Sequence, residues 1–416
     1  MTTTRTEPMR GPLPERRPEL DAIRMLVVVG LVFFHSALVF ATDDDYYVKN
    51  AETTEAVMII AGFGVVWAMP VLFLISGLGA RYSLRHRGAG GFAKERLLRL
   101  GVPLLFATLV LNPLPQWLRQ RSSGGDHQHE SYWRFLPRFY DVHMEPAEFP
   151  FVVQGEYFET GHLWFVVLLL TYSLLLIPLH RWLPHERVRR LGGRVAEAAL
   201  RRRTLVFLPA VGLAALCAFA GLEEDYAGWH RWSYLLFFVA GFVLAADDRF
   251  RIVLRRAAPA AALLGVLLFG AAGPGFALAE EPFTATTPLA TASRALFGAA
   301  GWCLVVAIPG LLDRRQARQS RSAAPHEPYE AQSRPRSRAV TMRRRLYGHL
   351  AAAVLPLYVL HQPIVVVVAY FVTGWSAPIV VEYAVLVTLS LVVTLSAYEL
   401  LVRRTRTTRF LFGMRP

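Results

Sequence analysis

The chain has 416 residues, 54% of them hydrophobic, and its mean hydropathy is +0.34. Because the apolar residues form long runs rather than amphipathic periods, this composition indicates a membrane protein and argues against a soluble globular fold. The net charge of +14 does not indicate nucleic-acid binding, since the basic residues gather in short segments between the apolar runs.

The apolar runs predict the helices directly. A helix needs about 20 apolar residues to cross the ~30 Å hydrocarbon core of a bilayer. We therefore predict an all-α, polytopic integral membrane bundle with about ten transmembrane helices. In chain order, these lie near residues 21–42, 54–80, 96–118, 161–180, 203–221, 231–247, 257–277, 290–312, 347–371 and 378–402.

The charges between these segments predict the orientation in the membrane. With the N-terminus inside, most of the 45 Lys and Arg residues fall in cytoplasmic segments, whereas acidic clusters at 43–45 and 223–225 fall outside. We therefore predict a multi-pass protein of the cell membrane with both termini in the cytoplasm. Its expected parts are a cytoplasmic tail (1–20), a membrane domain (21–402) with a disordered basic loop (313–346), and a basic cytoplasmic tail (403–416).

The first predicted helix carries two polar residues on one face. His35 follows Arg24 by eleven residues, so the two side chains point within about 20° of each other and lie about 16 Å apart along the helix axis. Polar groups inside a span are costly unless they face protein or water, so both residues are functional candidates. Alternatively, Arg24 anchors the helix at the inner surface and His35 bonds a neighbouring helix.

A pair of arginines marks the cytoplasmic end of the third predicted span. Arg96 and Arg99 are three residues apart and therefore share a helix face. Guanidinium groups bind phosphates through forked hydrogen bonds, so the pair is expected to hold an anion. The alternative is again an anchor at the inner surface.

Further polar residues lie in the outer halves of the fourth and ninth spans. His361 precedes Pro363, which frees backbone groups that protein or water must satisfy. It is expected to orient an acceptor, or else to bond a neighbouring helix. His162 and Trp164 open the fourth span close to Glu156 and Glu159. His162, Trp164 and Glu156 are expected to line an entrance for a polar acceptor. Alternatively, Trp164 belongs to the interfacial aromatic belt.

The other candidate metal ligands lack a ligand spacing. His127, His129 and His143 lie at irregular intervals in the outer loop, and Cys217 and Cys303 sit separately in apolar runs. We therefore expect no metal site and no tightly bound cofactor.

Five segments together resemble the acyltransferase-3 family, and within it the glucan-modifying branch that succinylates periplasmic glucans. They are LDAIRMLVVVGLVFFH, FLISG, RLLRLGVP, HLWFVVLLL and YVLHQP. The resemblance covers nearly the whole membrane part. It implies that His35 is the catalytic residue and that Arg24, Arg96 and Arg99 bind acyl-CoA, a co-substrate. We expect no extracytoplasmic esterase-like domain of the kind that some members carry, so the resemblance does not specify the acceptor.

The resulting hypothesis is a membrane O-acyltransferase with His35 as general base. It would transfer an acetyl or succinyl-like group from cytoplasmic acyl-CoA to a hydroxyl of a carbohydrate or another small extracytoplasmic acceptor. We expect one continuous polar passage between His35 and the arginines. The main alternative is a secondary transporter of a small organic anion, and a third is a scaffold without chemistry. Oligomeric state, and direct transfer as against an acyl-histidine intermediate, stay open.

Overall fold

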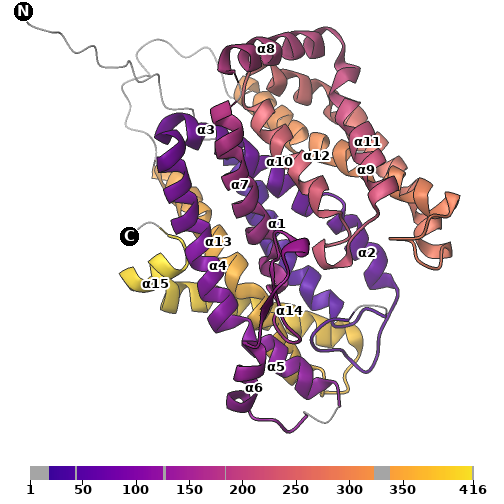
Figure 1. Cartoon of the computed structure of the whole chain (residues 1–416), viewed down its shortest axis with the longest axis vertical. Coiled ribbons are helices and arrows are strands. Elements are labelled where there is room, and N and C mark those ends of the chain that lie inside the picture. Colours follow the sequence, from indigo (N-terminus) through magenta and orange to yellow (C-terminus); the bar gives the residue numbers. More distant parts are fainter. Residues whose placement is uncertain (1–17, 43–44, 125–127, 183, 323–337, 415–416) are drawn as a thin grey trace, which may run out of the picture.

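The computed structural model describes residues 18–42, 45–124, 128–182, 184–322 and 338–414, and these form a bundle of helices (Figure 1). The only strands among them are β1 (His143–Met144) and β2 (Val153–Gln154), which pair antiparallel. The predicted all-α, polytopic membrane fold is confirmed.

The first half contains α1 (Pro18–Leu38), α2 (Ala56–Val65), α3 (Ala68–Arg96), the π-helix η1 (Leu97–Gly101), α4 (Val102–Phe106), the π-helix η2 (Ala107–Leu111), α5 (Pro113–Ser122), α6 (Tyr132–Phe139), η3 (Pro146–Glu148), η4 (Gly161–Leu163) and α7 (Trp164–Trp182).

The second half is helical as well. It contains α8 (His185–Arg201), η5 (Arg203–Phe207), α9 (Leu208–Ala220), η6 (Glu224–Tyr226), α10 (Arg231–Leu244), α11 (Arg249–Leu278), α12 (Pro288–Ser322), α13 (Arg338–Val372), α14 (Ile379–Ala397), the π-helix η8 (Tyr398–Val402) and α15 (Arg406–Leu411). Helix α8 lies across one end of the bundle (Figure 1).

Eight helical segments in the described part of the chain are long and apolar enough to cross a membrane. One of them, 59–122, contains both the second and the third predicted span, because the chain turns within α3 at Gly88. Gly88 has φ 68° and ψ 176°, a conformation that only glycine adopts readily. The sixth predicted span corresponds to α10, which has only 14 residues. The number of ten crossings therefore stays a prediction.

The second predicted span, 54–80, is not continuous as expected. It breaks at Val66 and Trp67 into α2 and α3. The reason is Pro70, whose ring would collide with the carbonyl of Val66 four residues earlier in an unbroken helix. The indole nitrogen of Trp229 donates a hydrogen bond to the carbonyl of Val65 at 3.2 Å, which satisfies a backbone group at the break.

The loop predicted over 313–346 is also shorter than expected. Helix α12 continues to Ser322 and α13 already begins at Arg338. Residues 323–337 lie outside the described residues. The extension of α12 includes Asp313, which is buried and paired with Arg251 of α11, so tertiary contacts stabilise helix where composition alone predicts a linker.

Small residues allow the helices around the site to approach closely. A Cβ atom on Gly77 of α3 would lie 1.9 Å from the carbonyl oxygen of Phe238, and one on Gly241 of α10 would lie 2.0 Å from that of Leu74. The two glycines therefore let α3 and α10 pack backbone to backbone. Helix α1 packs against α13, and this pairing brings the N-terminal and C-terminal parts of the chain together.

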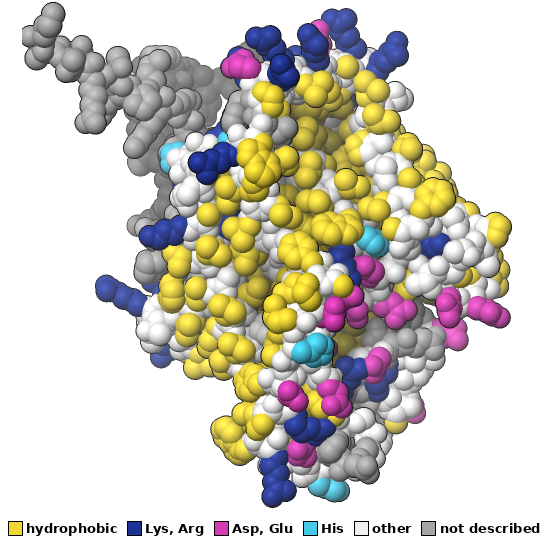
Figure 2. All heavy atoms as spheres, in the orientation of Figure 1, with side chains coloured by type: hydrophobic (Ala, Val, Ile, Leu, Met, Phe, Trp, Pro, Cys, Tyr) yellow, Lys and Arg dark blue, Asp and Glu magenta, His cyan; other side chains and the backbone are white. Residues whose placement is uncertain are grey.

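The surface agrees with a membrane protein (Figure 2). Apolar side chains cover the middle of the visible face, Lys and Arg gather over α8 at one end, and Asp and Glu lie mainly on the other half. The basic residues thus lie at the end that the sequence predicts to be inner, and the acidic residues lie toward the end that it predicts to be outer. The orientation itself stays a prediction, and "inner" and "outer" below refer to it.

Candidate functional site

Three histidines from distant parts of the chain meet at one point. His35 lies on α1, His162 in η4 and His361 on α13. The ring centroids of His35 and His361 are 5.2 Å apart, and those of His162 and His361 are 5.0 Å apart. We call these three residues the histidine cluster. His361 is fully buried, and His162 nearly so.

Hydrogen bonds fix the protonated nitrogen of two of these rings. His361 donates from Nδ1 to the carbonyl of Tyr358 at 2.5 Å, and His162 donates from Nε2 to the carbonyl of Val359 at 3.2 Å. A carbonyl can only accept, so Nε2 of a neutral His361 carries a lone pair. This atom and Nδ1 of His35 are buried without a partner among the described residues. The cluster therefore contains two buried ring nitrogens without a hydrogen-bond partner in the described structure.

A cavity of about 260 Å³ begins at this cluster. His35, His162 and Tyr358 line one end, and the hydroxyl of Tyr358 is engaged with the carbonyl of His162. The rest of the lining comes from α1 between Leu26 and Phe34, from the break between α2 and α3, and from Trp164 and Ala227. Non-helical backbone at membrane depth is tolerated where it lines a cavity, which explains the position of the break.

The described residues do not form the expected polar passage from His35 to the arginines. Between His35 and Leu26, the α1 residues that line the cavity are apolar or glycine. Arg24 is not among the lining residues; it forms an ion pair with Asp21 at 3.0 Å and contacts the carbonyl of Ile75 at 3.4 Å. The two ends of α1 thus share a helix face, as predicted, but the space between them is apolar.

The three arginines do come together at the inner end. Arg24 lies close enough to both Arg96 and Arg99 for electrostatic repulsion between the guanidinium groups. Arg96 stacks over the ring of Phe92, and its Nε atom is buried without a partner among the described residues. The side chain of Arg99, in the π-helix η1, is 47% exposed and lies 3.5 Å from Glu95. We call these three residues the arginine cluster.

Sequence reasoning missed two tyrosines that, with Glu159, form a second polar group beside the histidines. Tyr46 stacks on His35 with a centroid distance of 5.9 Å, and Tyr47 packs against Tyr46 at 5.4 Å. The hydroxyl of Tyr47 donates a hydrogen bond to Glu159, three residues before His162. Burial raises the pKa of the Glu159 carboxyl group, and burial together with Glu159 raises the pKa of Tyr47 well above its usual value. The contact lies between residues 112 apart in the chain, so no local motif indicates it.

The predicted entrance residues have different surroundings. Trp164 is buried between Tyr226 and Tyr234, with centroid distances of 5.9 and 5.1 Å, and it lines the cavity. Glu156 is exposed and does not line it. A role for Glu156 in acceptor binding therefore has no support from its position, whereas Glu159 lies beside the cluster.

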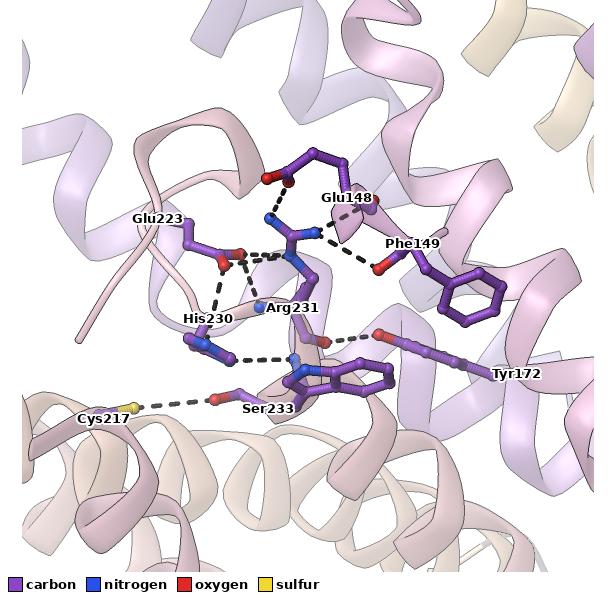
Figure 3. Close-up of polar contacts among 9 residues, drawn as sticks. Glu148, Phe149, Tyr172, Cys217, Glu223, His230, Arg231 and Ser233 are labelled. Atoms are coloured by element: carbon purple, nitrogen blue, oxygen red, sulfur yellow. Dashed lines mark hydrogen bonds and ion pairs between the residues drawn. The ribbon is translucent and has the colours of Figure 1, made fainter. Parts of the chain in front are cut away.

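An ion-pair network holds the outer segments over this region (Figure 3). Arg231 bonds Glu223 at 3.1 Å and Glu148 at 3.3 Å, and its backbone carbonyl accepts a hydrogen bond from Tyr172 of α7. It thereby joins the outer loop around Glu148 to the start of α10. Phe151 of the same loop stacks on Tyr226, which packs on Trp164, so the network fixes one wall of the cavity.

No group of three or more metal-ligating side chains suited to a metal ion occurs among the described residues. His129 and His143 are exposed, and His127 lies outside the described residues. The site consists of imidazole, phenol and carboxyl groups, which suit proton transfer and hydrogen bonding.

Comparison with known proteins identifies the family. No curated protein and no solved structure matches the chain significantly. A model of the acyltransferase-3 family, described as an acyltransferase domain, matches residues 17–399. This range contains the histidine cluster, the arginine cluster and the cavity. Because the match covers most of the chain, this membrane protein belongs to the acyltransferase-3 family.

Proposed function

We propose that this membrane acyltransferase moves an acyl group from cytoplasmic acyl-CoA to a hydroxyl of a carbohydrate or other small acceptor from the outer side. The observation that carries the proposal is the histidine cluster: His35 and His162 line the end of a cavity, and Nδ1 of His35 lacks a partner in the described structure. A hydroxyl that attacks a thioester needs a base of this kind.

The reaction requires two proton transfers, one from the acceptor hydroxyl to His35 and one from His35 to the departing thiolate. His35, in its neutral form, accepts the proton of the acceptor hydroxyl at Nδ1 while the hydroxyl oxygen attacks the thioester carbonyl. The new ester C–O bond forms, the C–S bond breaks, and His35 returns the proton to the departing thiolate of the coenzyme. His361 and His162 orient the acceptor hydroxyl, and Trp164 forms part of the wall beside it.

The arginine cluster supplies the binding energy for the donor. Guanidinium groups bind phosphate oxygens through charge-assisted hydrogen bonds, and the three groups converge at the inner end of α1. The rise of about 16 Å from Arg24 to His35 is a length that an extended pantetheine arm spans roughly. Because Arg24 does not line the cavity, this arm would approach His35 from outside the cavity. Acyl-CoA is therefore a co-substrate, and no tightly bound cofactor is part of the proposal.

Radiolabelled acyl-CoA tests the function directly. Membranes that contain the wild-type protein should transfer label to an extractable acceptor, and membranes with His35→Ala at equal abundance should not. Mass spectrometry of envelope glycans and secreted products, from cells with and without the gene, then identifies the acceptor. A secondary transporter would leave every acceptor unlabelled, and this result would overturn the proposal.

A further inference from the structure

The cavity beside the histidine cluster has an apolar lining over most of its length. Leu26, Val27, Leu31 and Phe34 of α1 face Val65 and other residues at the break between α2 and α3. The polar side chains His35 and His162 lie together at one end. Such a cavity suits a ligand with a reactive polar head and an apolar chain.

The size of the cavity indicates how long that chain can be. An engineered cavity of about 150 Å³ lined by Leu, Ile and Phe stays dry and binds benzene. The cavity here measures about 260 Å³, so it has room for more than a six-carbon hydrocarbon. An acetyl group would leave most of it unfilled. A succinyl group would bury its carboxylate among apolar side chains, at a large desolvation cost.

Two glycines keep this space open. Gly30 of α1 and Gly64 of α2 both line the cavity, and a Cβ atom on either would meet no atom within 4 Å. Any larger side chain at these positions would reduce the space. Leu26, at the far end of the lining, is 63% exposed. The cavity thus reaches the lipid-facing surface of α1, where an apolar chain can enter from the hydrocarbon.

We propose that this cavity is an acyl-chain site and that the transferred group is an apolar acyl chain longer than acetyl. The inference rests on the proposed function and specifies its donor. With the thioester carbonyl at His35, the chain lies along α1 toward Leu26. An apolar part of the acceptor is the other group that would fit this cavity. The experiment below distinguishes it from the acyl chain of the donor.

The first arm of the experiment measures the affinity of acyl-CoA esters for the protein in nanodiscs by calorimetry. Each buried methylene contributes roughly a fourfold gain in affinity. Hexanoyl-CoA should therefore bind at least about tenfold more tightly than acetyl-CoA or succinyl-CoA. Gly64→Leu should remove this gain, so that hexanoyl-CoA binds no more tightly than acetyl-CoA to the variant. Gly270→Leu is the matched control, because Gly270 on α11 also has open space around it and does not line the cavity.

The second arm uses labelled acetyl-CoA with ethanol, hexanol or octanol as acceptor. Transfer that does not depend on alcohol length, together with the chain-length gain in the first arm, supports the acyl-chain site. Equal affinity for acetyl-CoA and hexanoyl-CoA overturns it, and transfer that rises with alcohol length and is lost in Gly64→Leu then assigns the cavity to the acceptor. If no CoA ester binds at all, the acyl-CoA donor of the proposed function fails instead.

Discussion

The two ends of α1 present different kinds of polar site. At the outer end, the histidine cluster combines side chains from α1, η4 and α13, and two of its ring nitrogens have no partner among the described residues. At the inner end, Arg24 and Arg99 are partly exposed and already face Asp21 and Glu95. The outer site is assembled and enclosed by the fold, whereas the inner site is accessible and partly neutralised.

This contrast assigns different tasks to the two ends. A buried imidazole with a free nitrogen can act on a substrate without first breaking a bond within the protein. A guanidinium group that faces a carboxylate must exchange that partner for a phosphate, and this exchange is sensitive to salt. Substitutions at the outer end should therefore change the rate of transfer, and substitutions at the inner end should change donor affinity.

The largest expected effect is at the outer end. His35→Ala, or His35→Gln with a more similar volume, should lower the rate of acyl transfer by at least about a hundredfold, because a positioned base contributes 10²–10⁴-fold. Acyl-CoA affinity should stay within about twofold. The measurement is label transfer at saturating donor, with expression and detergent elution as controls for folding. A variant that keeps most of its activity would show that another group is the base.

The second effect is at the inner end. Arg96→Ala or Arg99→Ala should weaken acyl-CoA binding by about tenfold or more, since a hydrogen bond to a charged group is worth about 1.5–3 kcal/mol. Acceptor affinity should not change. Calorimetry at low and high salt measures both properties, and added salt should weaken wild-type binding.

Arg187→Ala provides the control for this second effect. It removes the same charge from an exposed position on α8, away from the arginine cluster. Donor affinity that falls equally in Arg187→Ala would mean that general surface charge, rather than the cluster, attracts acyl-CoA. Donor affinity that is unchanged in Arg96→Ala and Arg99→Ala would exclude the anion site.

The sequence predicts the two clusters unequally. Spacing along one helix places Arg24 and His35 on a common face, and it places Arg96 beside Arg99. Polar residues inside apolar runs also single out His162 and His361 separately. Their convergence depends on the packing of α1 against α13 and on the start of α7, which local periodicity does not contain.

The break before Pro70 follows from a local rule, although the length of the apolar run obscures it. Other features depend on contacts between distant segments. The burial of Glu159 against Tyr47 and the apolar lining of the cavity are tertiary properties. Glu156 and Glu159 are equivalent candidates in the sequence, and only the fold shows that one is exposed and the other enclosed.

The smallest expected effect concerns the carboxyl groups of Glu156 and Glu159. Because burial raises the pKa of Glu159 in the folded protein, ionisation is easier in the unfolded chain. Wild-type stability therefore falls as pH rises from the usual pKa of Glu, about 4.3, through the raised value. Glu159→Gln keeps an acceptor for the Tyr47 hydroxyl and removes the ionisation.

The variant should gain melting temperature relative to wild type as pH rises across that window, on the order of a degree. Melting curves in detergent between about pH 4 and 7 measure the difference. Glu156→Gln is the matched control, because its side chain is exposed, and it should show no such trend. An equal trend in both variants would mean that removing any carboxylate at this surface has the same effect, and the burial of Glu159 would then not be its cause.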